Sequence, residues 1–272
     1  MTDSRNINKI SREKWEPVHL PAKFKVGSCV NSSEVHFDMR YDIDLGERVQ
    51  SAYVQLNGGM FDYQPHGTFY KVLAERGYKP ISLEEAAILR VMGSANIGGL
   101  LAEDRFPKIS DKDCTTKEAF VYVPDKGLFL TRNSPLIEGP SEVVKMYTDD
   151  IKEHYLTDEQ VEAALADAVK ISDNPEQGIN PIPARRFAES EIANWAFGGA
   201  AGDYGSLLSY CGINSMPIYW TKRKHEEKPF ARQAVLRDLW FPLCGEREGY
   251  SALSATELVP RNVRGIKVQE AE

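Results

Sequence analysis

The segment 35–45 brings together side chains that bind divalent metal ions and transfer protons. Its ionisable residues alternate with apolar ones, and they are His36, Asp38, Arg40, Asp42 and Asp44. Carboxylates and imidazoles are common metal ligands, and they also act as general acids and bases. Groups two residues apart on a strand lie about 6–7 Å apart, so one ion reaches a neighbouring pair but never all four donors.

This spacing predicts Asp42 and Asp44 as candidate metal ligands, and His36 and Asp38 as candidate catalytic residues of a metal-dependent hydrolase. The alternative is a solvated face, or a face covered by a partner, in which Arg40 supplies the counter-charge between the acids.

Cys29 and His66 are the other candidate catalytic residues. A thiolate nucleophile needs a nearby base or a positive field, and His36 or His66 can supply the base for Cys29 if the fold brings them together. His66 stands in a turn beside aromatic residues and is itself a candidate acid or base. The alternatives are a small buried cysteine and a solvent-exposed turn histidine.

Two further segments have the composition of anion-binding sites. Gly199 and Gly202 belong to a glycine-rich segment before a helix, where backbone amides can bind phosphate. The spacing matches neither the dinucleotide-binding motif nor the P-loop, and tight packing between helices is the alternative. Lys222, Arg223 and Lys224 form a cationic cluster that predicts either a phosphate or nucleic-acid contact or a solvated loop.

A β-hairpin is the element that positions the first of these candidates. The period of two over residues 35–45 predicts a strand with one apolar and one polar face. Residues 46–47 suit a type II′ turn, and residues 48–57 are the predicted second strand. A two-residue loop sets Met39 opposite Val54 and Asp38 opposite Gln55, so both faces keep their character across the pair.

Local signals predict helices and short strands along the rest of the chain. Capping boxes, apolar stripes and terminal glycines predict helices over residues 68–77, 82–92, 141–155, 157–168, 188–197, 203–211 and 230–241. Turn residues 124–127 predict a second hairpin over residues 119–132, and residues 263–268 predict a closing strand. Residues 93–118 are expected to be irregular, and residues 172–186 to form a long loop or linker.

This separation of strands from helices predicts an α+β fold. Its N-terminal half carries long antiparallel β-hairpins, and its C-terminal half is mainly helical with short terminal strands. A change of character near residue 137 divides the chain into a strand-rich region, residues 1–137, and a helix-rich region, residues 141–272. One continuous domain fits the sequence equally well.

The composition is that of a soluble globular protein, with 42% hydrophobic and 27% charged residues. The net charge of −7 argues against nucleic-acid binding through bulk charge. Residues 1–17 lack the apolar core of a signal peptide, and no apolar run approaches the ~20 residues of a membrane span. The four cysteines are widely spaced, which favours reduced thiols. We therefore expect a cytoplasmic protein, or a virus- or phage-encoded protein that works inside a cell, with no membrane association.

Three short segments near the end of the chain resemble a known fold family. They are Arg237–Phe241, Ser251–Ser254 and Arg264–Lys267. Their order resembles the closing strands of C-type-lectin-like domains, which include formylglycine-generating-type and retroelement-diversified binding proteins. The resemblance implies a binding domain of that fold, and it assigns no functional residue.

The aromatic residues of the C-terminal half indicate a binding surface in addition to core. Trp195, Trp220 and Trp240 lie there, and aromatic residues favour both burial and interfaces. A long hairpin edge also favours pairing with a second copy. We expect a partner- or ligand-binding protein, with a protein partner or self-association and no cofactor. A metal-dependent hydrolase, a nucleic-acid- or phosphate-binding protein and a C-type-lectin-like domain are the alternatives.

Overall fold

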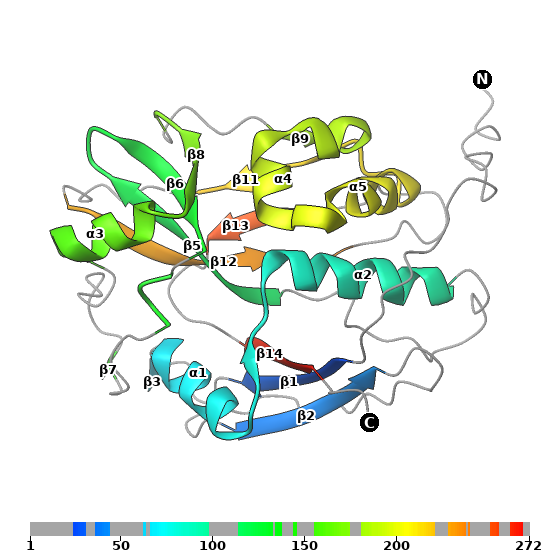
Figure 1. The fold of residues 1–272 in the computed structure, drawn as a ribbon, viewed down its shortest axis with the longest axis horizontal. Helices are drawn as coiled ribbons and strands as arrows, with labels where there is room; N and C mark the ends of the chain where they lie inside the picture. The colour runs from blue at the N-terminus through cyan, green and yellow to red at the C-terminus, as the bar shows by residue number, and fades with distance from the viewer. Residues whose placement is uncertain are drawn as a thin grey trace.

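The computed structural model (Figure 1) describes much of the chain outside the N-terminal segment. The described residues are 24–30, 36–43, 62–63, 66–97, 114–132, 134–137, 144–145, 155–174, 181–220, 228–237, 239, 251–255 and 262–268.

The described helices are short. They are α1 (His66–Glu75), α2 (Leu83–Ile97), α3 (Asp158–Leu165), α4 (Glu191–Phe197) and α5 (Ala201–Tyr210), with the 3₁₀ helices η5 (Ala184–Glu189) and η6 (Gly198–Ala200). None of the helices in these described stretches is long and apolar enough to cross a membrane.

A six-stranded sheet has the strand order β11–β13–β12–β5–β6–β8. Its members are β5 (Cys114–Val123), β6 (Gly127–Thr131), β8 (Ala168–Ser172), β11 (Ile218–Tyr219), β12 (Phe230–Leu236) and β13 (Leu253–Ala255). β11 and β13 are parallel, and the other neighbours are antiparallel. α3 contacts β5 and β6, and α4 contacts β8.

A four-stranded sheet has the order β2–β1–β14–β4. Its members are β1 (Phe24–Val30), β2 (His36–Ile43), β4 (Lys79–Pro80) and β14 (Asn262–Val268). β1 and β14 are antiparallel over their whole length, from the pair Phe24–Val268 to the pair Val30–Asn262. α1 contacts both of these strands, and α2 crosses the view between this sheet and the helices α4 and α5 (Figure 1).

Two further strand pairs are short. They are β3 (Asp62–Tyr63) with β7 (Val144–Lys145), and β9 (Ile182–Pro183) with β10 (Ser215–Met216).

The main hydrophobic core joins the six-stranded sheet to α2, α4 and α5. Phe120 and Leu130 contribute from the sheet, and Phe187, Phe197 and Tyr204 contribute from the helical layer; all five are buried. The ring of Phe197 stacks on that of Tyr204 with a centroid distance of 5.1 Å. Such ring pairs add to the stabilisation from buried area, so this contact fixes α4 against α5.

Capping signals in the sequence set the observed helix starts. The Ser82 hydroxyl accepts a hydrogen bond from the Glu85 N–H, and the Glu85 carboxylate accepts one from the Ser82 N–H. Thr157 and Gln160 make the same reciprocal pair before α3. Gly212 follows α5 with φ 72°, a left-handed conformation that glycine adopts without strain.

The α+β class predicted from the sequence is confirmed. The hairpin predicted over residues 119–132 forms β5 and β6, and the closing strand at 263–268 forms β14. The strand predicted over 35–45 is confirmed as β2, whose neighbour is β1. Its predicted partner, residues 48–57, lies outside the described residues.

The helix predicted over 230–241 is wrong, because Phe230–Leu236 form the strand β12. β12 lies between β13 and β5 in the sheet, and every one of its residues is buried. A strand buried on both faces has no polar face, so its sequence shows neither a helical period nor a strand period. The helix predicted over 141–155 is also wrong at Val144–Lys145, which form β7.

Other boundaries differ from the predictions. α2 continues through Gly93 to Ile97, since one glycine costs a packed helix only about 1 kcal/mol. Residues 114–118, expected to be irregular, begin β5. The helix predicted to reach Ala168 ends at Leu165, and β8 begins at Ala168.

Strands from both sides of residue 137 pair with one another. β5 lies beside β12, and β1 lies beside β14. The division of the chain into two domains stays a prediction.

Candidate functional site

The described hairpin candidates lie on β2, an edge strand of the four-stranded sheet, and Cys29 lies on the neighbouring strand β1. In the β1–β2 register, His36 pairs with Val30, Asp38 with Ser28 and Asp42 with Lys25. Cys29 pairs with Phe37, one register position from His36. His66 is the first residue of α1, on another element. Their roles stay predictions, and Asp44 lies outside the described residues.

An extra residue interrupts the pairing of β2. Val26 pairs with Tyr41 and Gly27 with Met39, so Arg40 is inserted opposite the step between them. Such a bulge bends the strand and increases its twist. The alternation in the sequence shows no break here, so it gave no sign of the bulge.

The glycine-rich segment packs closely against α2 and η5. The Gly199 N–H donates to the Glu84 carboxylate at 2.8 Å. Gly198 has φ 49°, and a Cβ at this position would collide with the same carboxylate. Gly205 lies so close to Phe187 that a Cβ would clash with it, which is tight packing of α5 against η5. A Cβ at Gly202 would meet nothing within 4 Å.

These contacts give the segment a packing role between α2, η6 and α5. Binding of phosphate by Gly199 and Gly202 stays a prediction. Lys222, Arg223 and Lys224 lie outside the described residues.

A buried polar cluster surrounds Arg90 of α2. Its guanidinium donates to the Tyr204 hydroxyl at 2.8 Å and to the Leu236 carbonyl oxygen at 3.0 Å. It also lies 3.4 Å from the Ser251 hydroxyl, which is 3.1 Å from that of Tyr204. Arg90 is only 1% exposed, so the cluster joins α2, α5 and β12 inside the core.

The predicted aromatic residues divide between core and surface. Trp220 is buried, and its ring lies 4.7 Å from the Arg232 guanidinium, which also lies 5.3 Å from the ring of Phe230. Trp195 is only partly buried at the edge of the core. Trp240 lies outside the described residues.

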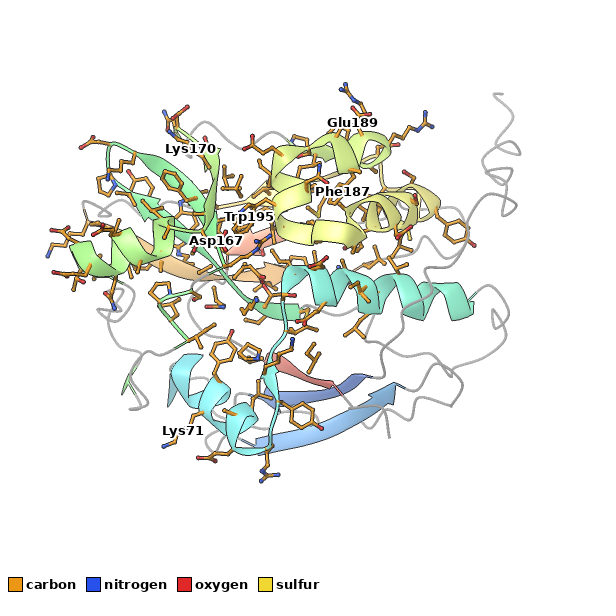
Figure 2. All side chains as sticks on the ribbon, in the orientation of Figure 1. Lys71, Asp167, Lys170, Phe187, Glu189 and Trp195 are labelled. Atoms are coloured by element: carbon orange, nitrogen blue, oxygen red, sulfur yellow. The ribbon has the colours of Figure 1, made fainter. Side chains whose placement is uncertain are left out.

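Trp195 belongs to a cluster with Arg132 and Asp167, which we call the Arg132 cluster. Arg132 follows β6, Asp167 lies in the turn between α3 and β8, and Trp195 lies on α4. Figure 2 shows Asp167 and Trp195 close together in the view, where the start of β8 approaches α4. The Arg132 N–H donates to the Asp167 carbonyl oxygen at 3.2 Å, which fixes the backbones together.

The Arg132 side chain is held on two sides and remains accessible. It donates to the Trp195 carbonyl oxygen at 2.7 Å, and its guanidinium carbon lies 4.6 Å from the Trp195 ring centroid. Its Nη1 lies 3.7 Å from Asp167 Oδ2. The Arg132 and Asp167 side chains are 42% and 43% exposed. The cluster thus presents donors, an acceptor and an aromatic ring in a fixed arrangement.

The sequence indicated Trp195 by its type, but it gave no signal for Arg132 or Asp167. These two residues belong to no motif, and the pairing of β6 with β8 brings them together. Within the described stretches, no three histidine, cysteine or acidic side chains lie together as metal ligands.

Comparisons with known proteins found little similarity. No family model matches the chain, and no curated protein matches it. A solved structure described under "Accommodation of massive sequence variation in Nanoarchaeota by the C-type lectin fold" is 12% identical. The alignment covers 79% of this chain and 100% of that one, with a TM-score of 0.46. This distant similarity identifies neither a family nor a function for the chain.

Proposed function

We propose that the chain is a partner-binding protein and that the Arg132 cluster forms part of its binding surface. The observation that carries this proposal is the convergence of three side chains from separate elements, of which Arg132 and Asp167 remain accessible. Arginine and tryptophan are enriched among the residues that dominate protein interfaces.

The fixed geometry of Arg132 supports this role. Its guanidinium lies over an aromatic ring and donates to a backbone carbonyl, so it loses little freedom when a partner binds. Arg132 offers N–H donors, and Asp167 offers a carboxylate acceptor beside them. This pair fits a partner surface that carries the opposite arrangement of charges. The partner is a protein, and a second copy of this chain is one form of it.

We also propose that the chain has the fold of a C-type-lectin-like binding domain. The residues that carry the sequence resemblance include Leu253–Ser254, which lie in β13, and Arg264–Lys267, which lie in β14. β14 pairs with β1 along its whole length, as a closing strand does.

The test compares Arg132→Ala with Arg186→Ala as a matched control. Arg186 is also exposed and paired with an acid, Glu189, at 2.6 Å. Partners captured by the wild-type chain are purified, and their Kd is measured by calorimetry. Self-association is measured by sedimentation. We expect Arg132→Ala to weaken binding at least tenfold, because it removes both the donors and the cation.

Folding is checked in parallel. An ion pair as exposed as that of Arg132 contributes at most about 1 kcal/mol, so the variant stays folded. Equal Kd values, or equal sedimentation, for the wild type and Arg132→Ala would show that the partner binds elsewhere.

A further inference from the structure

The ion pair of Arg132 and Asp167 differs from the other ion pairs between described residues. In those other pairs the charged nitrogen and oxygen are within hydrogen-bond distance, and they are Lys79–Glu85, Lys170–Asp173 and Arg186–Glu189. Arg132 Nη1 and Asp167 Oδ2 are 3.7 Å apart, which is too far for a hydrogen bond. The two charges are therefore neighbours that do not use each other's hydrogen-bonding groups.

Both side chains keep hydrogen-bonding capacity that the described part of the chain does not use. A guanidinium carries five N–H donors, and within the described residues that of Arg132 donates to the Trp195 carbonyl oxygen. The Asp167 carboxylate accepts no hydrogen bond from a described residue, and its nearest described cation is Arg132. Because both side chains are accessible, a partner can reach the donors of one and the acceptor of the other.

The arrangement of these two charges is complementary to itself. A two-fold axis sets each residue of an interface against its neighbour's counterpart, so Arg132 of one copy meets the partner's Asp167, and Asp167 meets the partner's Arg132. The four charges then alternate in sign around the axis, and each guanidinium lies between two carboxylates. The fork of an arginine also matches the two oxygens of a carboxylate.

The frame that holds the pair favours such a contact. The Arg132 N–H donates to the Asp167 carbonyl oxygen at 3.2 Å, which fixes the two backbones. The Arg132 guanidinium carbon lies 4.6 Å from the centroid of the Trp195 ring. Little side-chain freedom is therefore lost when a second copy binds.

We propose that the Arg132 cluster is the centre of a two-fold symmetric interface between two copies of this chain, in which the Arg132 guanidinium of each copy binds the Asp167 carboxylate of the other. This inference rests on the binding surface proposed above and assigns a second copy as its partner. The pair carries no net charge, so it does not select a strongly acidic or basic partner, whereas a second copy carries the required opposite arrangement.

Sedimentation velocity of the full chain tests the interface, at concentrations from about 1 μM to about 500 μM, where weak dimers form. The wild type is expected to associate as its concentration rises. Arg132→Asp and Asp167→Arg are each expected to weaken association at least tenfold, because four like charges then face one another. An equimolar mixture of the two variants restores opposite charges across the interface, so association is expected to return.

The matched control applies the same reversals to Arg186 and Glu189. That pair is already hydrogen-bonded within one chain at 2.6 Å. Arg186→Asp and Glu189→Arg, alone and mixed, are therefore expected to sediment like the wild type. Circular dichroism and thermal melting check that each variant is folded.

A wild type that stays monomeric over this range would overturn the inference. A dimer that both reversals leave intact would also overturn it, as would a mixture that does not recover. If the reversals do not fold, Asp167→Asn replaces them, since it removes the carboxylate charge at almost unchanged size, and an unweakened dimer would then overturn the inference. The Kd of a captured partner for Arg132→Ala tests the proposed function separately from these results.

Discussion

Replacing Tyr204 by phenylalanine removes one hydroxyl from the buried cluster around Arg90 and leaves the ring in place. The ring keeps its stacking on Phe197 and its edge contact with Phe187, at centroid distances of 5.1 and 5.8 Å. The change removes the 2.8 Å hydrogen bond donated by the Arg90 guanidinium and the 3.1 Å hydrogen bond between the Tyr204 and Ser251 hydroxyls. A hydrogen bond to a charged group contributes about 1.5–3 kcal/mol.

We therefore expect Tyr204→Phe to lower the free energy of unfolding by about 2 kcal/mol. For a chain of this size the Tm falls by roughly 4–8 °C. Urea denaturation followed by circular dichroism measures the first quantity, and calorimetry measures the second. Tyr210→Phe is the matched control, because Tyr210 ends the same helix with 41% of its surface exposed. Its stability is expected to stay within about 0.5 kcal/mol of the wild type.

A double-mutant cycle with Ser251→Ala tests the cluster as a unit. The Tyr204 and Ser251 hydroxyls lie 3.1 Å apart and share the same Arg90 nitrogen, so their effects are expected to be non-additive by at least about 0.5 kcal/mol. A Tyr204→Phe variant as stable as the wild type would show that the hydrogen bond from Arg90 to the Tyr204 hydroxyl does not stabilise the fold.

Two further predictions follow from burial and backbone conformation. Burial raises the pKa of Cys211 to about 12, although the Arg90 charge acts to lower it. The native thiol should therefore resist modification by iodoacetamide at pH 8, as followed by mass spectrometry. Modification as fast as in the denatured protein would contradict this prediction. Gly198→Ala should lower the free energy of unfolding by about 1–3 kcal/mol, which is the usual cost of such backbone strain. At Gly198 φ is 49°, and the new Cβ would collide with the Glu84 carboxylate. Gly202→Ala, with open space around the Cβ, should leave urea stability unchanged or slightly higher, and equal losses for the two glycines would contradict the account.

The sequence predicted elements whose signals are local. The reciprocal pairs at Ser82 and Thr157 involve residues three apart, and the chain shows these helix starts without reference to the rest of the fold. The glycine after α5 and the turn between β5 and β6 are signals of the same kind. Such features depend on a few neighbouring residues, so a sequence alone specifies them.

Elements specified by distant partners could not be predicted in this way. β12 is buried on both faces, and only its pairing with β5 and β13 distinguishes it from a buried helix. The inserted Arg40 in β2 leaves no trace in the apolar alternation.

The residues of the candidate binding surface could also be predicted only in part from the sequence. The type of Trp195 was informative, but its neighbours Arg132 and Asp167 meet it through the β6–β8 register and the packing of α4.

The pairing of β1 with β14 has a consequence for the order in which the protein folds. Phe24 and Val268 are direct neighbours, so this contact closes a loop containing nearly all of the described chain. Closing so long a loop carries a large entropic cost, and proteins rich in such distant contacts fold slowly. During synthesis the β1–β14 pair cannot form until β14 has left the ribosome. Until then the edge of β1 that later pairs with β14 is open to pairing with other chains.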